Sequence, residues 1–196
     1  MLLLEECAHA NIVDTWKRDH VNFSQLLDLL EAQIGLFHED QTPNYELMLD
    51  ILYYMTHYPD IFHHPKEDLT AARARDLDAG AATAVHELMR QHAVLRESGA
   101  KLLKQLQGIV DGAMLKRESA EQAARAYIAY FRSHMRQEEL KIFPLAQKLL
   151  SKRDWAAIEK AAPFREDPLF GEGALEKRYE RLHRQIVQEA ELADAT

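Results

Sequence analysis

The sequence predicts an all-α fold: an up-down-up-down four-helix bundle followed by extra C-terminal helices. Apolar residues recur three and four positions apart over long stretches, which is the period of a helix with one buried face. Glycine and proline are sparse, at 7 and 6 residues, and β-branched runs are few, so the patterns of strands are missing. At 196 residues we expect one domain, with the bundle over residues 11–150 and a helical appendage over 151–196.

Four long helices are expected, at residues 11–37, 43–76, 81–110 and 119–150. Thr42 is a possible cap of the second helix. Pro59 should break that helix, because proline lacks a backbone donor and clashes one turn back; Asp60 would then cap the resumed helix. Pro144 should bend the fourth helix, and Asp111-Gly112 is typical of a helix end. Two further helices are expected near residues 154–158 and 174–192.

Charge and composition exclude several classes of function. The net charge of −8 argues against nucleic acid or an anionic membrane as a partner, because both require clustered cationic surface. No apolar run approaches the length of a membrane span, and the acidic N-terminal stretch does not have the pattern of a signal peptide. Cys7 is the single cysteine, so no internal disulfide can form. We therefore expect a cytoplasmic protein.

Histidine is the unusual residue of this composition, at 10 positions. Each long helix places one histidine on its apolar face, and two helices add a glutamate one turn further on. Four-helix bundles build metal sites in this way, from side chains that converge on the core. The candidate ligands are His20, His63, Glu67, His92, His134 and Glu138.

The alternative is a set of structural core histidines. A lone buried histidine is more often a hydrogen-bonded core residue than a ligand. A buried carboxylate without a partner is costly, however, so two inward glutamates beside inward histidines favour a metal site. Imidazole and carboxylate suit a transition metal such as iron and also suit zinc. Two facing pairs can hold two metals, with the carboxylates as bridges.

The register of the first pair is ambiguous. His64 and Asp68 repeat the spacing of His63 and Glu67, and on a straight helix the two choices differ by about 100°. By the same geometry, Asp68 and Glu139 should behave as solvent-facing residues if Glu67 and Glu138 face inward.

The remaining histidines have weaker interpretations. His57 and His86 are expected to be structural or exposed, with a role beside the ligands as the less favoured option. His9, His38 and His183 are expected on the surface, and the Glu6/His9 and Glu180/His183 spacings are treated as chance.

Taken together, the motifs resemble the bacterial hemerythrin-like proteins with an HHE cation-binding domain, over roughly residues 14–150. The residues that carry the resemblance are Asp19-His20, His63-His64-Pro65-Lys66-Glu67-Asp68, Gln91-His92, His134-x-x-x-Glu138 and Ile142-Phe143-Pro144. In that family a proline follows the second glutamate by six residues, as Pro144 follows Glu138. Counting in the same way in the first motif favours the pair His63 and Glu67 over the pair His64 and Asp68.

The resemblance implies a non-haem di-iron centre with zinc or manganese as alternative metals. Glu67 and Glu138 would bridge two iron ions, together with an oxo or hydroxo group, and the four matched histidines would be terminal ligands. Oxygen carriers of this family have a second histidine four residues away on the third helix. Here those positions are Leu88 and Arg96, which leaves open metal positions.

Helical phase also suggests roles around the ligands. His64 and His86 would lie just outside them, and Tyr127 or Tyr130 would donate a hydrogen bond to a bound small molecule. Phe62, Leu88 and Phe131 would limit the access of water.

The expected function is a di-iron protein that binds, senses or reacts with O2, NO or peroxide, in iron handling or in oxidative or nitrosative stress. One alternative is a di-iron oxidoreductase that reduces peroxide or NO. It would need an external electron donor, because no flavin or nucleotide motif is visible. Another is a metal-dependent regulatory protein that acts through a protein partner or as a homodimer.

Overall fold

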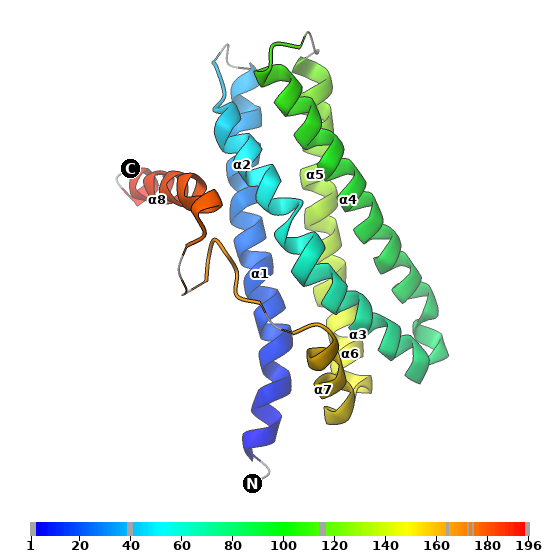
Figure 1. Ribbon diagram of the computed structural model, residues 1–196. Helices are drawn as coiled ribbons and strands as arrows, with labels where there is room; N and C mark the ends of the chain where they lie inside the picture. The colour runs from blue at the N-terminus through cyan, green and yellow to red at the C-terminus, as the bar shows by residue number, and fades with distance from the viewer. Residues whose placement is uncertain are drawn as a thin grey trace.

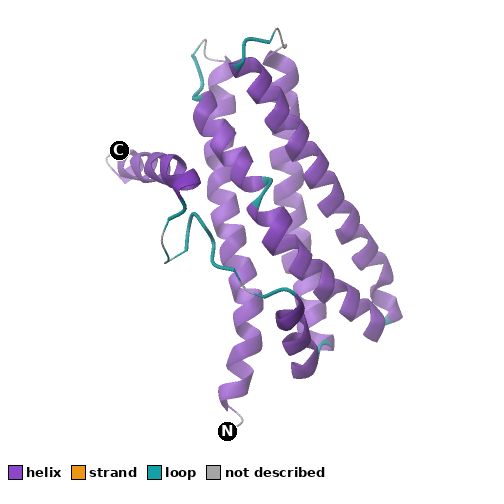
Figure 2. Ribbon diagram, viewed as in Figure 1, coloured by secondary structure: helices purple, strands orange, loops and turns teal. Residues whose placement is uncertain are grey.

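The computed structural model describes the backbone of residues 3–38, 41–113, 117–163, 165–171, 173 and 175–194, and the side chains of these ranges from residue 12 to 188 except that of residue 38. All regular secondary structure within these residues is helical, as Figure 2 shows. The predicted all-α class is therefore confirmed. None of the described helices is long and apolar enough to cross a membrane.

The long helices form the predicted bundle, and the chain runs up, down, up and down along its axis (Figure 1). α1 makes the first pass, α2 and α3 the second, α4 the third, and α5 and α6 the fourth. The α-helical bounds are α1 Leu3–Gly35, α2 Tyr45–Met55, α3 His64–Leu77, α4 Ala82–Val110, α5 Arg117–Gln137, α6 Phe143–Leu149, α7 Lys152–Ala161 and α8 Glu180–Asp194. Short 3-10 turns lie at Leu36–His38, Ala79–Ala81 and Lys177–Tyr179.

The helix ends follow local chemistry, with one correction. Asn44, rather than Thr42, caps α2, because its side-chain oxygen accepts a hydrogen bond of 3.0 Å from the backbone N–H of Leu47. Gly112 ends α4 as predicted, and its φ of +83° is a conformation that glycine adopts without strain.

The second and fourth passes of the bundle are each interrupted by a π-helical turn, at Pro59–His63 and Glu138–Ile142. The N–H of His64 donates to the carbonyl of Pro59, and the N–H of Phe143 donates to that of Glu138. The next residue in each case is a proline, which has no N–H to continue the α-helical ladder. Each interruption therefore inserts a wider turn, and such turns are frequent at functional sites.

The first π-helical turn changes the direction of two side chains. His63 and His64 are both buried, at 2% and 1% exposure, although adjacent residues of a straight helix point about 100° apart. Asp60, expected to be a helix cap, lies inside this turn, and its carboxylate accepts a hydrogen bond from His64 at 3.1 Å.

The apolar core consists of two clusters with a polar layer between them. The larger cluster contains residues such as Phe23, Tyr54, Leu95, Leu102 and Phe131. The smaller one contains residues such as Trp16, Ala71, Val85, Phe143 and Trp155. On the first three passes the candidate ligands lie between residues of the two sets, and on the fourth Glu138 does so, while His134 lies between Phe131 and Met135 of the larger cluster.

The C-terminal segment packs on the bundle at two places. α7 lies against α3, where Trp155 is buried and Arg73 donates to Asp154 at 2.7 Å. α8 contacts α2, where buried Asp50 accepts hydrogen bonds from Arg178 and Arg181, each at 2.8 Å.

Candidate metal centre

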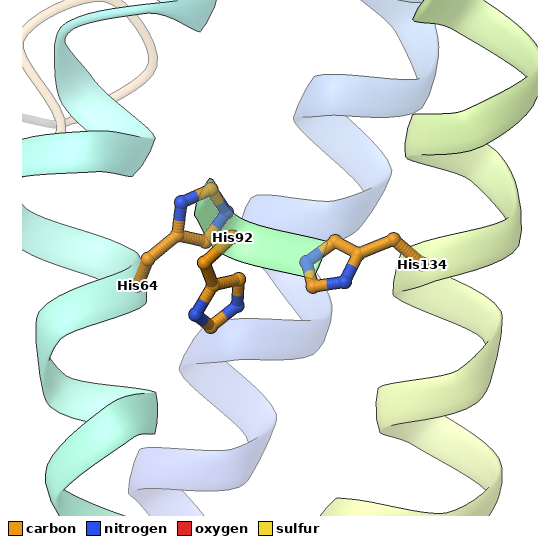
Figure 3. A group of neighbouring side chains, drawn as sticks. All are labelled: His64, His92 and His134. Carbon is orange, nitrogen blue, oxygen red and sulfur yellow. The ribbon is translucent and has the colours of Figure 1, made fainter. Parts of the chain in front are cut away.

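The structure brings the six candidate ligands together and adds His64 to them. Three groups of side chains each place one potential ligand atom per residue within 4.8 Å of the others. The groups are His64/His92/His134, His20/His63/Glu67 and Glu67/His92/Glu138. Figure 3 shows the first group, with the three imidazoles converging from different helices. Because Glu67 and His92 are each shared by two groups, the three groups form one continuous cluster.

The cluster is shielded from solvent, since its most exposed member, His20, is only 3% exposed. Apolar rings pack on its edges. Phe131 lies 6.2 Å from His64 and 6.0 Å from His134, measured between ring centroids, and Phe143 stacks on His20 at 5.5 Å. The polar layer is thus enclosed by the two apolar clusters.

Each of the five histidines is oriented through its Nδ1 atom. That atom lies 2.8–3.1 Å from a carboxylate or amide oxygen in every case. The partners are Glu139 for His20, Asp19 for His63, Asp60 for His64, Asp68 for His92 and Gln91 for His134. An Nδ1–H that donates in this way leaves Nε2 as the free lone pair, which is the usual arrangement of a metal-ligating histidine.

Nε2 of His92 and Oε1 of Glu138 lie within hydrogen-bond distance of each other, at 3.2 Å, but most of the other atoms that face the centre of the cluster lack hydrogen-bond partners. They are the buried Nε2 atoms of His20, His63 and His134, both carboxylate oxygens of Glu67, and Oε2 of Glu138. Unpaired buried polar atoms are costly, and here six of them gather at one place. A cation in the cluster would satisfy all of them, and imidazole nitrogen with carboxylate oxygen is a donor set suited to transition metals. The residues present therefore fit a metal site.

The two glutamates each face histidines from more than one helix. Oε1 of Glu67 lies 3.1 Å from Nε2 of His63, and its Oε2 lies 3.7 Å from Nε2 of His92. For Glu138, Oε1 lies 3.2 Å from Nε2 of His92, and Oε2 lies 3.3 Å from Nε2 of His134. The two oxygens of each carboxylate thus approach different histidines.

Burial sets the protonation of the cluster. It lowers the pKa of His20, His64 and His134, which keeps these rings neutral, the form that binds metals. Burial together with the nearby charge of Glu67 raises the pKa of Glu138 well above its ordinary value. Burial also disfavours the charged form of His63, but Glu67 and Asp19 outweigh it and raise the pKa of His63 to about 10. Without a metal, protons at His63 and Glu138 thus offset the buried negative charge.

The position of His64 differs from the sequence prediction, which placed it outside the ligands. Its imidazole belongs to the convergent group with His92 and His134. The physical reason is the π-helical turn, which allows His63 and His64 to face the interior together. Proline at positions 59 and 65, on both sides of the pair, was the available signal of an irregular helix.

Asp68 and Glu139 also differ from the expectation that they would act as solvent-facing residues. Their side chains are 33% and 42% exposed, yet each carboxylate reaches back to the Nδ1 atom of a candidate ligand. Helical phase places the Cα atoms correctly but does not describe how far a flexible carboxylate can extend.

The other residues proposed around the ligands lie further away. His86 is exposed on α4. Tyr127 packs on Phe131 at 5.8 Å, one ring away from the cluster. The buried hydroxyl of Tyr130 has no hydrogen-bond partner among the described residues, and neither tyrosine makes a described hydrogen bond to a candidate ligand.

Two of the remaining histidines lie away from the cluster. His57 stacks on Tyr53 at 3.8 Å, and His183 is exposed. The side chains of His9 and His38 lie outside the described residues.

Comparison with known protein families matches residues 11–146 to the Hemerythrin HHE cation binding domain. Searches of curated proteins and of solved structures gave no significant match. The matched span covers the four passes of the bundle and every residue of the histidine–glutamate cluster, so the family assignment and the geometry point to the same cation site. The chain belongs to the hemerythrin HHE cation-binding family.

Proposed function

We propose that this chain is a non-haem di-iron protein whose centre binds a small ligand such as O2, NO or peroxide. The observation that carries the proposal is the set of buried, unpaired nitrogen and oxygen atoms that converge between the two apolar clusters. The proposed ligands are His20, His63, His64, His92, His134, Glu67 and Glu138.

The number of donors favours two ions over one. The cluster contains five histidines and two glutamates, which together could offer up to nine donor atoms if each carboxylate uses both oxygens. One octahedral ion takes about six ligands, whereas two take about twelve. Glu67 and Glu138 lie between the His20/His63 side and the His92/His134 side of the cluster. Each carboxylate would thus be able to contribute to an ion on either side of the cluster.

The donor type favours iron, with manganese and zinc as the alternatives. Structural zinc sites usually take four ligands in a tetrahedron, fewer than this cluster offers to two ions. Mixed imidazole and carboxylate coordination with positions left over is typical of non-haem iron that reacts with small molecules.

The chain's own residues prepare the site for a small, uncharged ligand. Asp19, Asp60, Asp68, Glu139 and Gln91 fix the histidine rings through Nδ1. The rings of Phe23, Phe131 and Phe143 pack on three sides and exclude water, which disfavours large or charged ligands. When bound, iron would supply the redox chemistry and the vacant coordination positions.

The test is metal analysis of protein purified without added metal, followed by absorption spectra of the reduced protein exposed separately to NO, O2 and peroxide. We expect about two iron ions per chain, the number that the donor count favours, and a spectral change with at least one of these ligands. The Glu67→Ala/Glu138→Ala variant is the control and should show neither. A single zinc per chain that does not respond to iron supplied during expression would contradict the proposal. Steady-state turnover with a reductant would favour an oxidoreductase over a binder or sensor.

A further inference from the structure

A cavity of about 550 Å³ lies between the bundle and the C-terminal appendage. Its walls come from α1, from the segment between α2 and α3, and from α7, which Figure 1 shows against this end of the bundle. The volume is in the range of small-molecule sites. We propose that this cavity binds a small carboxylic acid with an apolar, aromatic body.

Aromatic side chains provide the apolar part of the site. Trp16 from α1 and Trp155 from α7 line the cavity, are each 3% exposed, and have ring centroids 6.3 Å apart. Tyr58 and Phe62 line it from the bundle side, with ring centroids 5.9 Å apart. Rings of this kind pack favourably against a flat aromatic ligand in offset or edge-to-face arrangements.

Two arginines provide the recognition of an anion. Arg18 donates to Thr15 at 3.3 Å and has no carboxylate partner among the described residues. The guanidinium carbon of Arg165 lies 4.9 Å from the ring centroid of Phe62, and its Nη2 atom forms a long ion pair of 3.7 Å with Oε1 of Glu176. Guanidinium groups bind carboxylates through paired hydrogen bonds.

The described lining carries three cationic side chains, those of Arg18, Arg165 and Lys66, and two carboxylates, those of Asp19 and Glu159. Lys66 lies 3.4 Å from Glu159, and Asp19 accepts a hydrogen bond from His63, so the two arginines are the groups that would recognise an anion.

The hydroxyl of Tyr58 adds a hydrogen-bond donor to the site. Tyr58 is 4% exposed and lines the cavity, and its hydroxyl has no hydrogen-bond partner among the described residues. Because Tyr58 lines the cavity, its hydroxyl would donate a hydrogen bond to a carboxylate oxygen bound there.

The cavity approaches the metal centre from the outside. Asp19 and His63 form part of its lining, and Asp19 accepts the hydrogen bond from Nδ1 of His63 at 2.8 Å. The Nε2 atom of His63 faces the opposite way, toward Glu67. The organic acid would therefore contact the outer side of a candidate ligand and not the metal position itself. The inference does not depend on which metal the centre holds.

Intrinsic fluorescence provides a direct test, because the chain has 2 tryptophans and both line the cavity. The metal-loaded full chain is titrated with phenylacetate and, separately, with its neutral analogue phenylacetamide. We expect a saturable change in tryptophan emission with phenylacetate, confirmed by calorimetry. The amide should bind about tenfold more weakly, because it lacks the charge that the arginines recognise.

Substitutions separate the proposed contacts from general effects. Arg18→Gln and Arg165→Gln should each weaken phenylacetate binding by about tenfold, and Tyr58→Phe by about threefold. All three variants should keep their metal content, and Arg125→Gln, an exposed arginine on α5, is the matched control that should bind as the original chain does. The proposal is overturned if phenylacetate does not saturate the signal at millimolar concentration, if the amide binds equally well, or if the arginine variants bind like the control.

Discussion

The Nδ1 atom of His20 lies 2.9 Å from Oε1 of Glu139, a carboxylate whose side chain is 42% exposed. This hydrogen bond joins a residue at the surface to a ring that is 3% exposed in the centre of the bundle. It fixes the ring so that Nε2 points toward Glu138, at 3.4 Å. A residue at the surface thus controls the direction of a proposed ligand.

Glu139→Ala is therefore expected to weaken metal binding, although Glu139 itself is not a proposed ligand. Removing the acceptor frees the ring of His20, and loss of such a partner typically lowers metal affinity by about 10- to 100-fold. Competition with a chelator measures the affinity. Glu118→Ala, at an exposed position of α5, should leave it unchanged, while Glu139→Gln, which keeps an acceptor oxygen, should recover part of the loss. Equal affinities in the two alanine variants would show that this hydrogen bond does not matter.

His64→Ala is expected to reduce the metal content as other ligand substitutions do. The ring of His64 stacks on His92 at 4.2 Å and belongs to the convergent group at one side of the centre. Metal analysis and the absorption spectrum measure the effect. The matched control is His86→Ala, since His86 is exposed on α4. If His64→Ala retained full metal content, His64 would not be one of the metal ligands.

Substitution of either glutamate should remove more metal than substitution of a histidine at one side of the centre. Glu67→Ala and Glu138→Ala are each expected to lose most of both ions, because each carboxylate faces histidines on both sides of the cluster. His134→Ala should retain part of the metal, because His134 belongs to only one convergent group. The measurement is metal stoichiometry per chain after gel filtration. Loss of equal amounts in all three variants would argue against bridging.

The metal-free protein should become less stable as the pH rises from 7 to 10. His63 has a folded-state pKa of about 10, above its ordinary value of 6.5, because the opposing effect of burial is outweighed by Glu67 and Asp19. The folded state therefore binds a proton that the unfolded state has already released at pH 7. The stability that this proton contributes is lost as the pH approaches 10. The raised pKa of Glu138 acts in the same direction.

Urea unfolding at several pH values measures this effect. The metal-loaded protein should show a weaker dependence over the same range, because ligands bound to metal no longer carry these protons. If the stability of the metal-free and the metal-loaded protein depended on pH in the same way, the titrating protons would not be those of His63 and Glu138.

Much of the architecture was accessible from the sequence, because apolar periodicity and helix-ending residues act locally. The stripes around His20 and His92 predicted which faces are buried, and the two His-x-x-x-Glu spacings predicted which carboxylates turn inward. The inward position of His64 was not accessible in the same way. It depends on hydrogen bonds between residues five apart, as between His64 and Pro59, and helical phase assumes that the ladder is regular. The roles of Asp68 and Glu139 depend on side-chain reach between helices, which has no period in the sequence.

The polar layer between the two apolar clusters also has a consequence for how the protein opens. Each cluster is packed within itself, and the layer that joins them is built from groups whose inner atoms lack partners without a cation. In the metal-free protein we expect the end of the bundle around Trp16 and Phe143 to exchange its amide hydrogens as a separate cooperative unit, by sub-global opening. Bound metal would link α1, α3, α4 and α5 across the layer and merge the two units into one. Binding of the cation would then change the folding cooperativity of the whole bundle.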